Sequence, residues 1–177
     1  MYSVETINYI LALATLAMQA VGAGLLAVYF LRARFPDLED VGAFLTKWGL
    51  WSGLLLSLAG IALTLLYSEV IGYVPCGLCW LVRIFLYPQA ILFAIALWKR
   101  DRSVADYSIV LSAFGFVVAL YTHYLQMGGS SLVPCPASGV SDCARRLVFE
   151  FGYITLPMMG VTLFALLIIM MLFVRRR

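Results

Sequence analysis

The fold is decided by residues 54–98, which read LLLSLAGIALTLLYSEVIGYVPCGLCWLVRIFLYPQAILFAIALW. This stretch contains two apolar runs separated by a short segment with glycine, proline and two cysteines, and its only charged residues are Glu69 and Arg83. With its flanking residues, each run is long enough to cross a bilayer as a helix, which takes about 20 residues. The stretch therefore predicts two membrane-spanning helices joined by a short loop.

The whole chain has the same character as this stretch. Of its 177 residues, 64% are hydrophobic and 12% are charged, against roughly 45–50% and 25% in ordinary soluble domains. Mean hydropathy is +0.99, and a soluble domain of this size lacks the interior volume to bury so much apolar surface. The composition excludes a soluble enzyme, a disordered chain, a collagen and a nucleic-acid binder, and it predicts an integral membrane protein with membrane lipid around it.

Five apolar stretches are long enough to span. None alternates strictly between apolar and polar residues, and backbone groups in lipid must be satisfied internally, so helices are favoured over a barrel. The predicted fold is an all-α integral membrane protein, a four-helix transmembrane bundle plus one extra N-terminal transmembrane helix. The spans are placed at Ile7–Leu31, Phe44–Tyr67, Leu78–Trp98, Val104–Met127 and Tyr153–Val174.

The basic residues predict the orientation, because Lys and Arg favour cytoplasmic connections. Nine of the 12 basic residues flank the first or third connection or end the chain, and the second connection has none. This distribution predicts an extracytoplasmic N-terminus, a cytoplasmic C-terminus and extracytoplasmic second and fourth connections. The nine are Arg32, Arg34, Lys47, Lys99, Arg100, Arg102, Arg175, Arg176 and Arg177.

We divide the chain into two parts. Residues 1–43 form the additional N-terminal helix with its cytoplasmic connection, and residues 44–177 form the bundle with an extracytoplasmic loop at 128–152. Within that loop, Ala144–Phe151 mixes charged and apolar residues in a way typical of a short interfacial helix. In the second span, Gly49, Gly53 and Gly60 share a helix face, which favours close helix packing.

Four cysteines supply the candidate chemistry: Cys76, Cys79, Cys135 and Cys143. In the predicted topology all four face the oxidising side of the membrane. A c-type haem site needs histidine after the C-x-x-C motif, where Trp80 stands, and a zinc site prefers two closely spaced pairs. Two structural disulfides remain an alternative. The C-x-x-C spacing at a helix start favours a labile redox pair instead, and no metal is expected.

Two polar side chains are predicted near this pair. Pro75 places Cys76 and Cys79 in the first turn of the third span, where the helix dipole stabilises a thiolate, and Arg83 follows Cys79 on the same face. His123 is expected at a similar depth in the fourth span. Arg83 could instead extend to the membrane surface, and His123 could be an interfacial hydrogen-bonding group. Together under a thiolate, however, they suit a lipid-soluble acceptor with carbonyl oxygens, such as a quinone.

Residues 75–88, PCGLCWLVRIFLYP, strongly resemble the signature of the disulfide bond formation protein B family. The resemblance continues through Pro134-Cys135-Pro136, Cys143 and residues 152–157, GYITLP, and covers about Lys47 to Val174. The family has four spans, so the first span lies outside the resemblance. A member of this family is expected to be a bacterial cytoplasmic-membrane thiol:quinone oxidoreductase, an enzyme that passes electrons to ubiquinone or menaquinone.

The resemblance implies a role for each site residue. Cys135 and Cys143 match the loop pair that oxidises a partner, with Cys135 forming the mixed disulfide. Cys76 and Cys79 match the pair coupled to quinone, with the Cys79 thiolate facing the ring. Arg83 and His123 match residues of the quinone site. The implied partner is a soluble or anchored thioredoxin-like disulfide oxidase (DsbA-like).

Two other interpretations remain open. A vitamin K epoxide reductase-like protein shares the two-pair chemistry, although in that family the loop pair precedes the C-x-x-C motif. A non-enzymatic membrane protein with structural disulfides is the second alternative.

Overall fold

The computed structural model describes residues 4–32, 34–35, 39–130 and 143–175. In these ranges the chain is helical apart from its connections and one isolated antiparallel bridge between Glu150 and Ile154. Five helices are long and apolar enough to span a membrane, as the sequence predicted. The elements are α1 (Val4–Leu31), α2 (Glu39–Leu65), the π-helical turn η2 (Leu66–Val70), α3 (Gly77–Lys99), α4 (Val104–Gln126) and α5 (Leu156–Arg175).

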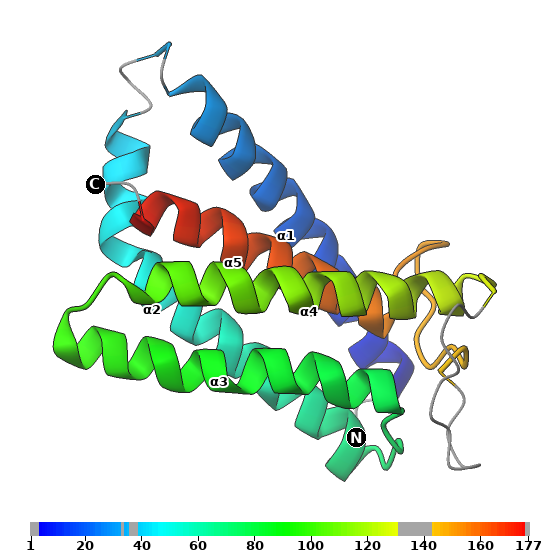
Figure 1. Ribbon diagram of the computed structural model, residues 1–177. Helices are drawn as coiled ribbons and strands as arrows, with labels where there is room; N and C mark the ends of the chain where they lie inside the picture. The colour runs from blue at the N-terminus through cyan, green and yellow to red at the C-terminus, as the bar shows by residue number, and fades with distance from the viewer. Residues whose placement is uncertain (1–3, 33, 36–38, 131–142, 176–177) are drawn as a thin grey trace.

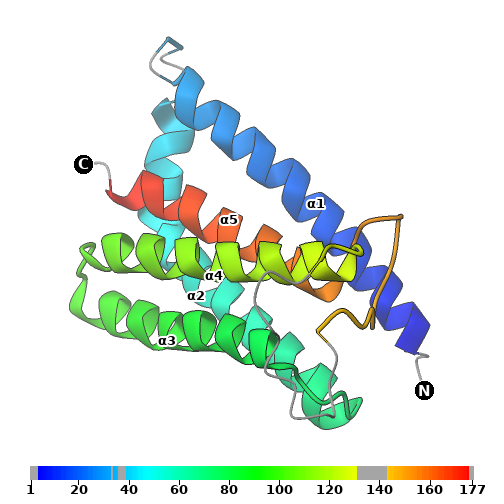
Figure 2. The ribbon, with the colours of Figure 1, turned by 45° about the vertical axis from the view of Figure 1, so that its right-hand side comes forward.

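The helices alternate in direction. Figures 1 and 2 show the start of α1, the end of α2, the start of α3, the end of α4 and the start of α5 at one end of the molecule. This end carries Cys76, Cys79 and Cys143, and we call it the cysteine end. The connection between α3 and α4 and the end of α5 lie at the opposite end. The alternating direction of the helices therefore brings Cys76, Cys79 and Cys143 to the same end of the molecule.

The core forms where α5 packs among α2, α3 and α4. Phe93 of α3 and Phe164 of α5 are fully buried. Each ring lies against a glycine: a Cβ on Gly53 would come within 2.9 Å of Phe93, and a Cβ on Gly115 would overlap Phe164. Small residues thus let the helix backbones approach closely, as lipid-embedded helices require in the absence of a hydrophobic driving force. The expected close packing at Gly53 is confirmed.

A polar cluster joins α3 to α4 inside this apolar core. The Oε1 atom of the fully buried Gln89 accepts hydrogen bonds from Ser108 Oγ at 2.7 Å and Ser112 Oγ at 3.2 Å. The Nε2 group of Gln89 donates to the carbonyl of Phe85 at 3.0 Å. Because no water is present in the bilayer interior, such internal partners are what make a buried amide tolerable there.

The first helix crosses the bundle obliquely and packs chiefly against α5, as Figure 2 shows. Its polar side chains make the specific contacts. Gln19 donates to Thr162 Oγ1 at 3.1 Å and accepts from the hydroxyl of Tyr153 at 2.7 Å. Asn8 accepts a hydrogen bond from the Tyr67 hydroxyl of η2. The additional helix is therefore tied to two elements of the bundle.

The prediction of a short interfacial helix at Ala144–Phe151 is wrong. These residues form turns and irregular chain, and the segment turns back on itself between Glu150 and Ile154 with positive φ angles at Phe151 and Gly152. Val148 and Ile154 are buried, so the segment folds against the bundle instead of lying flat on a membrane surface. As a consequence α5 starts at Leu156, three residues later than expected.

The second span also differs from its prediction. It begins before Phe44, at Glu39, and it continues past Tyr67 through the π-helical turn to Val70. A π-helical turn is rare in proteins and occurs frequently at functional sites. This one lies at the cysteine end, directly before the segment that leads into the C-x-x-C motif.

Candidate redox site

The C-x-x-C motif begins α3. After η2 the chain turns at Gly72, whose φ of +79° suits a residue without a side chain, and runs extended to Cys76. Cys76 is the N-cap of α3, and its sulfur accepts a hydrogen bond from the backbone N–H of Cys79 at 3.3 Å. The motif thus occupies the first helical turn, as predicted, with one sulfur serving as the cap.

The two sulfurs form a close pair. Cys76 Sγ and Cys79 Sγ are 2.7 Å apart, and both cysteines are free thiols. Hydrogen bonding from the Cys79 side chain, helped by the backbone N–H groups at the helix start, lowers the pKa of Cys76 from 9.0 to about 6 against the opposing effect of burial. The shift favours the thiolate of Cys76, which is the form that reacts in thiol–disulfide exchange.

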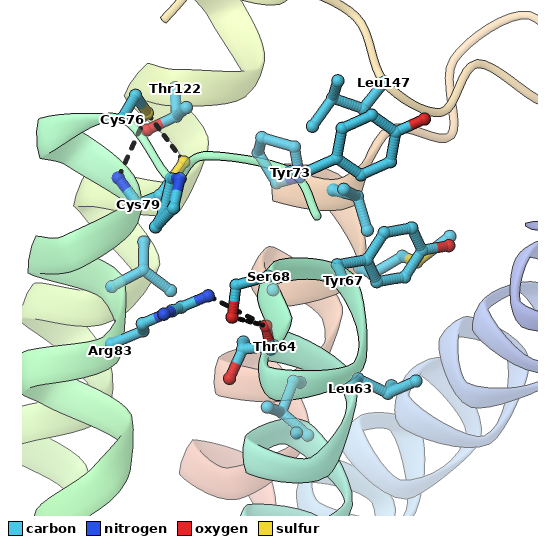
Figure 3. A pocket seen from close by; sticks show the side chains of 18 of the residues that line it. Leu63, Thr64, Tyr67, Ser68, Tyr73, Cys76, Cys79, Arg83, Thr122 and Leu147 are labelled. Atoms are coloured by element: carbon cyan, nitrogen blue, oxygen red, sulfur yellow. Dashed lines mark hydrogen bonds between the residues drawn. The ribbon is translucent and has the colours of Figure 1, made fainter. Parts of the chain in front are cut away.

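Arg83 lies one turn beyond Cys79 and is buried, with 7% of its surface exposed. Its Nη2 group donates to the carbonyl oxygen of Thr64 at 2.8 Å, where α2 approaches the π-helical turn (Figure 3). Its guanidinium carbon is 5.1 Å from the centroid of the Trp80 ring, within cation–π range. The side chain therefore points into the protein and does not extend to the surface.

These groups border a cavity of about 500 Å³. Its polar part contains Cys76, Cys79 and Arg83, together with Thr64 and Ser68 from the end of α2 and from η2. Figure 3 shows the Arg83 side chain reaching across from α3 toward Thr64 and Ser68, beneath the cysteine pair. The rest of the wall is largely apolar. It comes from α1, α2 and α5, with further residues from the segment before α3, from α3 and α4, and from the segment after Cys143. Such a cavity fits a small, mostly apolar ligand with a few polar atoms.

Cys143 comes to the same place from a distant part of the chain. It is disulfide-bonded and 3% exposed, and it packs with Cys76 and Leu125 in one buried cluster that Cys79 also contacts. Cys143 also lines the cavity. The structure therefore brings Cys143 to the C-x-x-C pair, whereas Cys135 lies outside the described residues and its role stays a prediction.

Gln126 holds the chain after Cys143 against the end of α4. Its Nε2 group donates to the carbonyl of Arg145 at 3.1 Å, and Arg146 Nε donates to the Gln126 carbonyl. Among the described residues, the buried Oε1 atom of Gln126 has no hydrogen-bond partner, and Gln126 lines the cavity.

His123 lies elsewhere. Its Nδ1 atom is 2.8 Å from Thr155 Oγ1, so the ring joins the end of α4 to the residue before α5. The residues that line the described cavity include its neighbour Thr122 but not His123. The geometry fits the hydrogen-bonding alternative better than a quinone contact.

Several residues of the site were missed by reading the sequence. Thr64, Ser68 and Gln126 lie near span ends, where polar residues are common and carry no specific signal. The hydroxyls of Thr64 and Ser68 are four residues apart, which puts them on one helix face. That spacing was the one sequence clue to a polar surface opposite Arg83.

The fold and the site together define a multi-pass membrane protein with a thiol pair at the wall of a largely apolar cavity. The family model for disulfide bond formation protein DsbB matches residues 46–174. The chain belongs to this family, which confirms the resemblance seen in the sequence.

Curated relatives agree with this assignment. The SPbeta prophage-derived disulfide bond formation protein B of Bacillus subtilis (strain 168) is 41% identical over 112 residues, 63% of this chain and 75% of that protein. The probable disulfide formation protein of Oceanobacillus iheyensis is 35% identical over 135 residues, 72% of this chain and 86% of that protein. Disulfide bond formation protein C of Bacillus subtilis (strain 168) is 34% identical over 124 residues, 68% and 86% of the two chains. No solved structure matches the chain.

The lowered pKa of Cys76 predicts a specific pH dependence. In Cys79→Ser protein the hydroxyl still donates to the Cys76 sulfur, so alkylation of Cys76 should keep its midpoint near pH 6. In Cys79→Ala protein the donor is lost, the pKa rises toward 9.0 and the midpoint should move up by at least about one pH unit. Mass spectrometry of the Cys76 peptide after timed iodoacetamide treatment at a series of pH values measures the alkylation midpoint of each variant. Equal midpoints in the two variants would show that the Cys79 hydrogen bond does not set the acidity of Cys76.

Proposed function

We propose that this protein is a dithiol:quinone oxidoreductase that regenerates an extracytoplasmic thioredoxin-like disulfide oxidase. The observation that carries the proposal is the C-x-x-C pair at the wall of a largely apolar cavity, with the buried Arg83 one turn below it and Cys143 beside it. Membership of the DsbB family supports disulfide formation as the overall activity.

The cysteine positions suggest the order of exchange. A partner thiolate attacks the disulfide formed by Cys135 and Cys143, and the second thiol of the partner resolves the mixed disulfide, which leaves the loop pair reduced. Because Cys143 lies in one buried cluster with Cys76, its thiolate then attacks the Cys76 sulfur of an oxidised Cys76–Cys79 pair, and Cys79 leaves as a thiolate. Cys135 resolves the Cys143–Cys76 bond, so two electrons have moved from the loop pair to the C-x-x-C pair.

A quinone is a suitable final acceptor because it takes up two electrons and two protons, which balances the oxidation of one dithiol to one disulfide. The cavity residues fit such a molecule. A guanidinium carries five N–H donors, and the Thr64 carbonyl takes one of those of Arg83, so donors remain for a ring carbonyl. Gln126, whose buried Oε1 atom has no hydrogen-bond partner among the described residues, also lines the cavity. Cys79 lies between the thiol partner Cys76 and Arg83, as a donor of electrons to this site should.

We further propose that the cysteine end faces the extracytoplasmic side, in a bacterial cytoplasmic membrane. The basic residues of the connections support this orientation, because the α3–α4 connection carries Lys99, Arg100 and Arg102 at the end opposite to the cysteines. A partner that forms disulfides acts in an oxidising compartment, so the loop pair must be accessible there.

Impermeant alkylation tests the orientation. After reduction of intact cells, a membrane-impermeant maleimide should label the loop cysteines, whereas a cysteine placed at Arg102 should be labelled only after lysis. A label at Arg102→Cys in intact cells, with the loop cysteines protected, would reverse the assigned orientation.

The reaction itself is tested by turnover with purified components. Wild-type protein, a quinone and a reduced thioredoxin-like oxidase should yield about one quinol for each partner disulfide formed, because each step moves two electrons. Cys79→Ala should form the mixed disulfide with the partner through the loop pair but produce no quinol. If mild dithiol treatment fails to open either pair, or quinone fails to re-form it, the cysteines form structural disulfides and the proposal is wrong.

Arg83 gives the sharpest prediction about the quinone site. Arg83→Ala removes a charge-assisted hydrogen bond worth about 1.5–3 kcal/mol, or roughly ten- to hundredfold in quinone affinity or rate. Arg83→Lys should fall between Ala and wild type because it keeps the charge without the planar donor geometry. Steady-state assays with varied quinone measure the loss, and mixed-disulfide formation with the partner serves as the control that should not change. If both variants fold and reduce quinone within about twofold of wild type, Arg83 does not contact the quinone.

A further inference from the structure

The cavity beside the cysteine pair is not uniform along its length. Its polar groups, which include Cys79, Arg83 and Ser68, gather toward the cysteine end. Farther along the helices the wall is apolar, and three helices contribute to it. These residues are Leu56, Ala59, Gly60 and Leu63 of α2, Met159, Gly160 and Leu163 of α5, and Leu11, Thr15 and Met18 of α1.

The part of the wall from α1 behaves as apolar surface. Thr15 is 4% exposed, and its hydroxyl donates to the carbonyl of Leu11 in its own helix at 2.8 Å. Its polar atom is therefore satisfied locally. Leu11 and Met18, one turn on either side, contribute only carbon and sulfur surface. Leu11, Thr15 and Met18 thus form a continuous apolar strip of α1 that faces the cavity.

Hydrogen bonds fix this strip at both ends. Asn8, one turn before Leu11, accepts from the buried Tyr67 of η2. Gln19, directly after Met18, bonds to Thr162 and Tyr153. Polar contacts of this kind hold helices together in lipid, where apolar contact alone gives little preference for one position over another. The register of α1 against the cavity is therefore set on both sides of the wall it provides.

The dimensions suit an elongated ligand. Along α2 and η2 the lining runs from Leu56 to Tyr67, which is about 16 Å at about 1.5 Å per helical residue. That is about half of a hydrocarbon layer of about 30 Å. A membrane quinone has a polar ring at one end of a long isoprenoid tail, which matches the order of polar and apolar surface in the cavity. A phospholipid chain shares the apolar chemistry, but its phosphate would have to occupy the polar end beside the thiols.

We propose that Leu11, Thr15 and Met18 of α1 form the wall against which the isoprenoid tail of the quinone lies. The α1 helix precedes residues 46–174, the part of the chain that the family model matches. The tail-binding strip is thus supplied by a helix outside that part, and it determines how tightly long-tailed quinones bind. This inference rests on the proposed use of quinone as electron acceptor.

Paired tryptophan variants test the wall. Met18→Trp fills the cavity, and Leu13→Trp places the same ring on the outward face of α1, where Leu13 is 44% exposed. For Met18→Trp, KM for a long-tailed quinone should rise about tenfold or more. The tail loses an apolar contact about as large as one buried side chain, and the free energy of such a contact corresponds to a change in affinity of this size. For the same quinone ring without a tail, KM should change by less than about twofold, and Leu13→Trp should change neither value.

Met18→Ala covers the case in which Met18→Trp fails to fold. It removes tail contacts without adding bulk, and it should weaken the long-tailed quinone about threefold to tenfold while sparing the tail-less ring. Equal changes for both quinones, or no change for either, would overturn the assignment of the wall to the tail.

Extraction of bound lipid separates this inference from the proposed function. Solvent extraction and mass spectrometry of wild-type protein purified from membranes should recover long-tailed quinone, and Met18→Trp protein should lose it while Leu13→Trp protein keeps it. Quinone bound in this α1-dependent way by a protein that fails to turn over would support the wall and reject the proposed function. Loss of phospholipid from Met18→Trp, with no quinone in either protein, would assign the cavity to an acyl chain and overturn the inference.

Discussion

The contact between the Arg83 guanidinium and the Thr64 carbonyl is the interaction on which the site depends. A cation buried in an apolar bundle is costly unless it is paired or hydrogen-bonded. Here a backbone carbonyl near the π-helical turn supplies the partner, and the Trp80 ring covers the guanidinium from the same helix. The contact ties α3 to the end of α2, and it holds a positive charge one turn below a thiol pair. Because this charge is held inward, the polar part of the cavity carries a guanidinium beside the thiols and hydroxyls.

The C-x-x-C pair and Cys143 illustrate how a small fold assembles redox groups from separate segments. The pKa of Cys76 is lowered for local reasons, since the neighbouring Cys79 thiol and, to a smaller extent, the backbone N–H groups at the helix start stabilise its thiolate. Its access to Cys143 has a different origin. The chain after Cys143 is clamped to the end of α4 through Gln126, Arg145 and Arg146, which brings the loop sulfur into the cluster around Cys76. Local chemistry thus sets reactivity, and the clamp sets which sulfurs meet.

Polar side chains do most of the positioning in this apolar protein. Gln89 with two serines joins α3 to α4, His123 with Thr155 joins α4 to the start of α5, and Gln19 and Asn8 locate α1. Each of these groups would be expensive without its partner in a medium that lacks water. The helix faces between them are apolar and glycine-containing, so they permit close packing but discriminate weakly among alternative registers. The few polar contacts therefore select one arrangement.

The sequence by itself determined the class of protein, the number of spans and the reactive pair. Span length, apolar composition and the Cys76–Cys79–Arg83 spacing are properties of short segments, so they can be read without knowing what those segments pack against. Only the tertiary structure decided that Cys143 joins the cluster around Cys76, that Thr64 receives Arg83, that His123 pairs with Thr155 and that α1 lines the cavity. It also replaced the expected helix at Ala144–Phe151 with an irregular segment, because burial of Val148 and Ile154 against the bundle outweighed the local helical pattern. Those outcomes depend on which helix faces pack together. When a helix is apolar on nearly all sides, its sequence does not indicate which face packs against which neighbour.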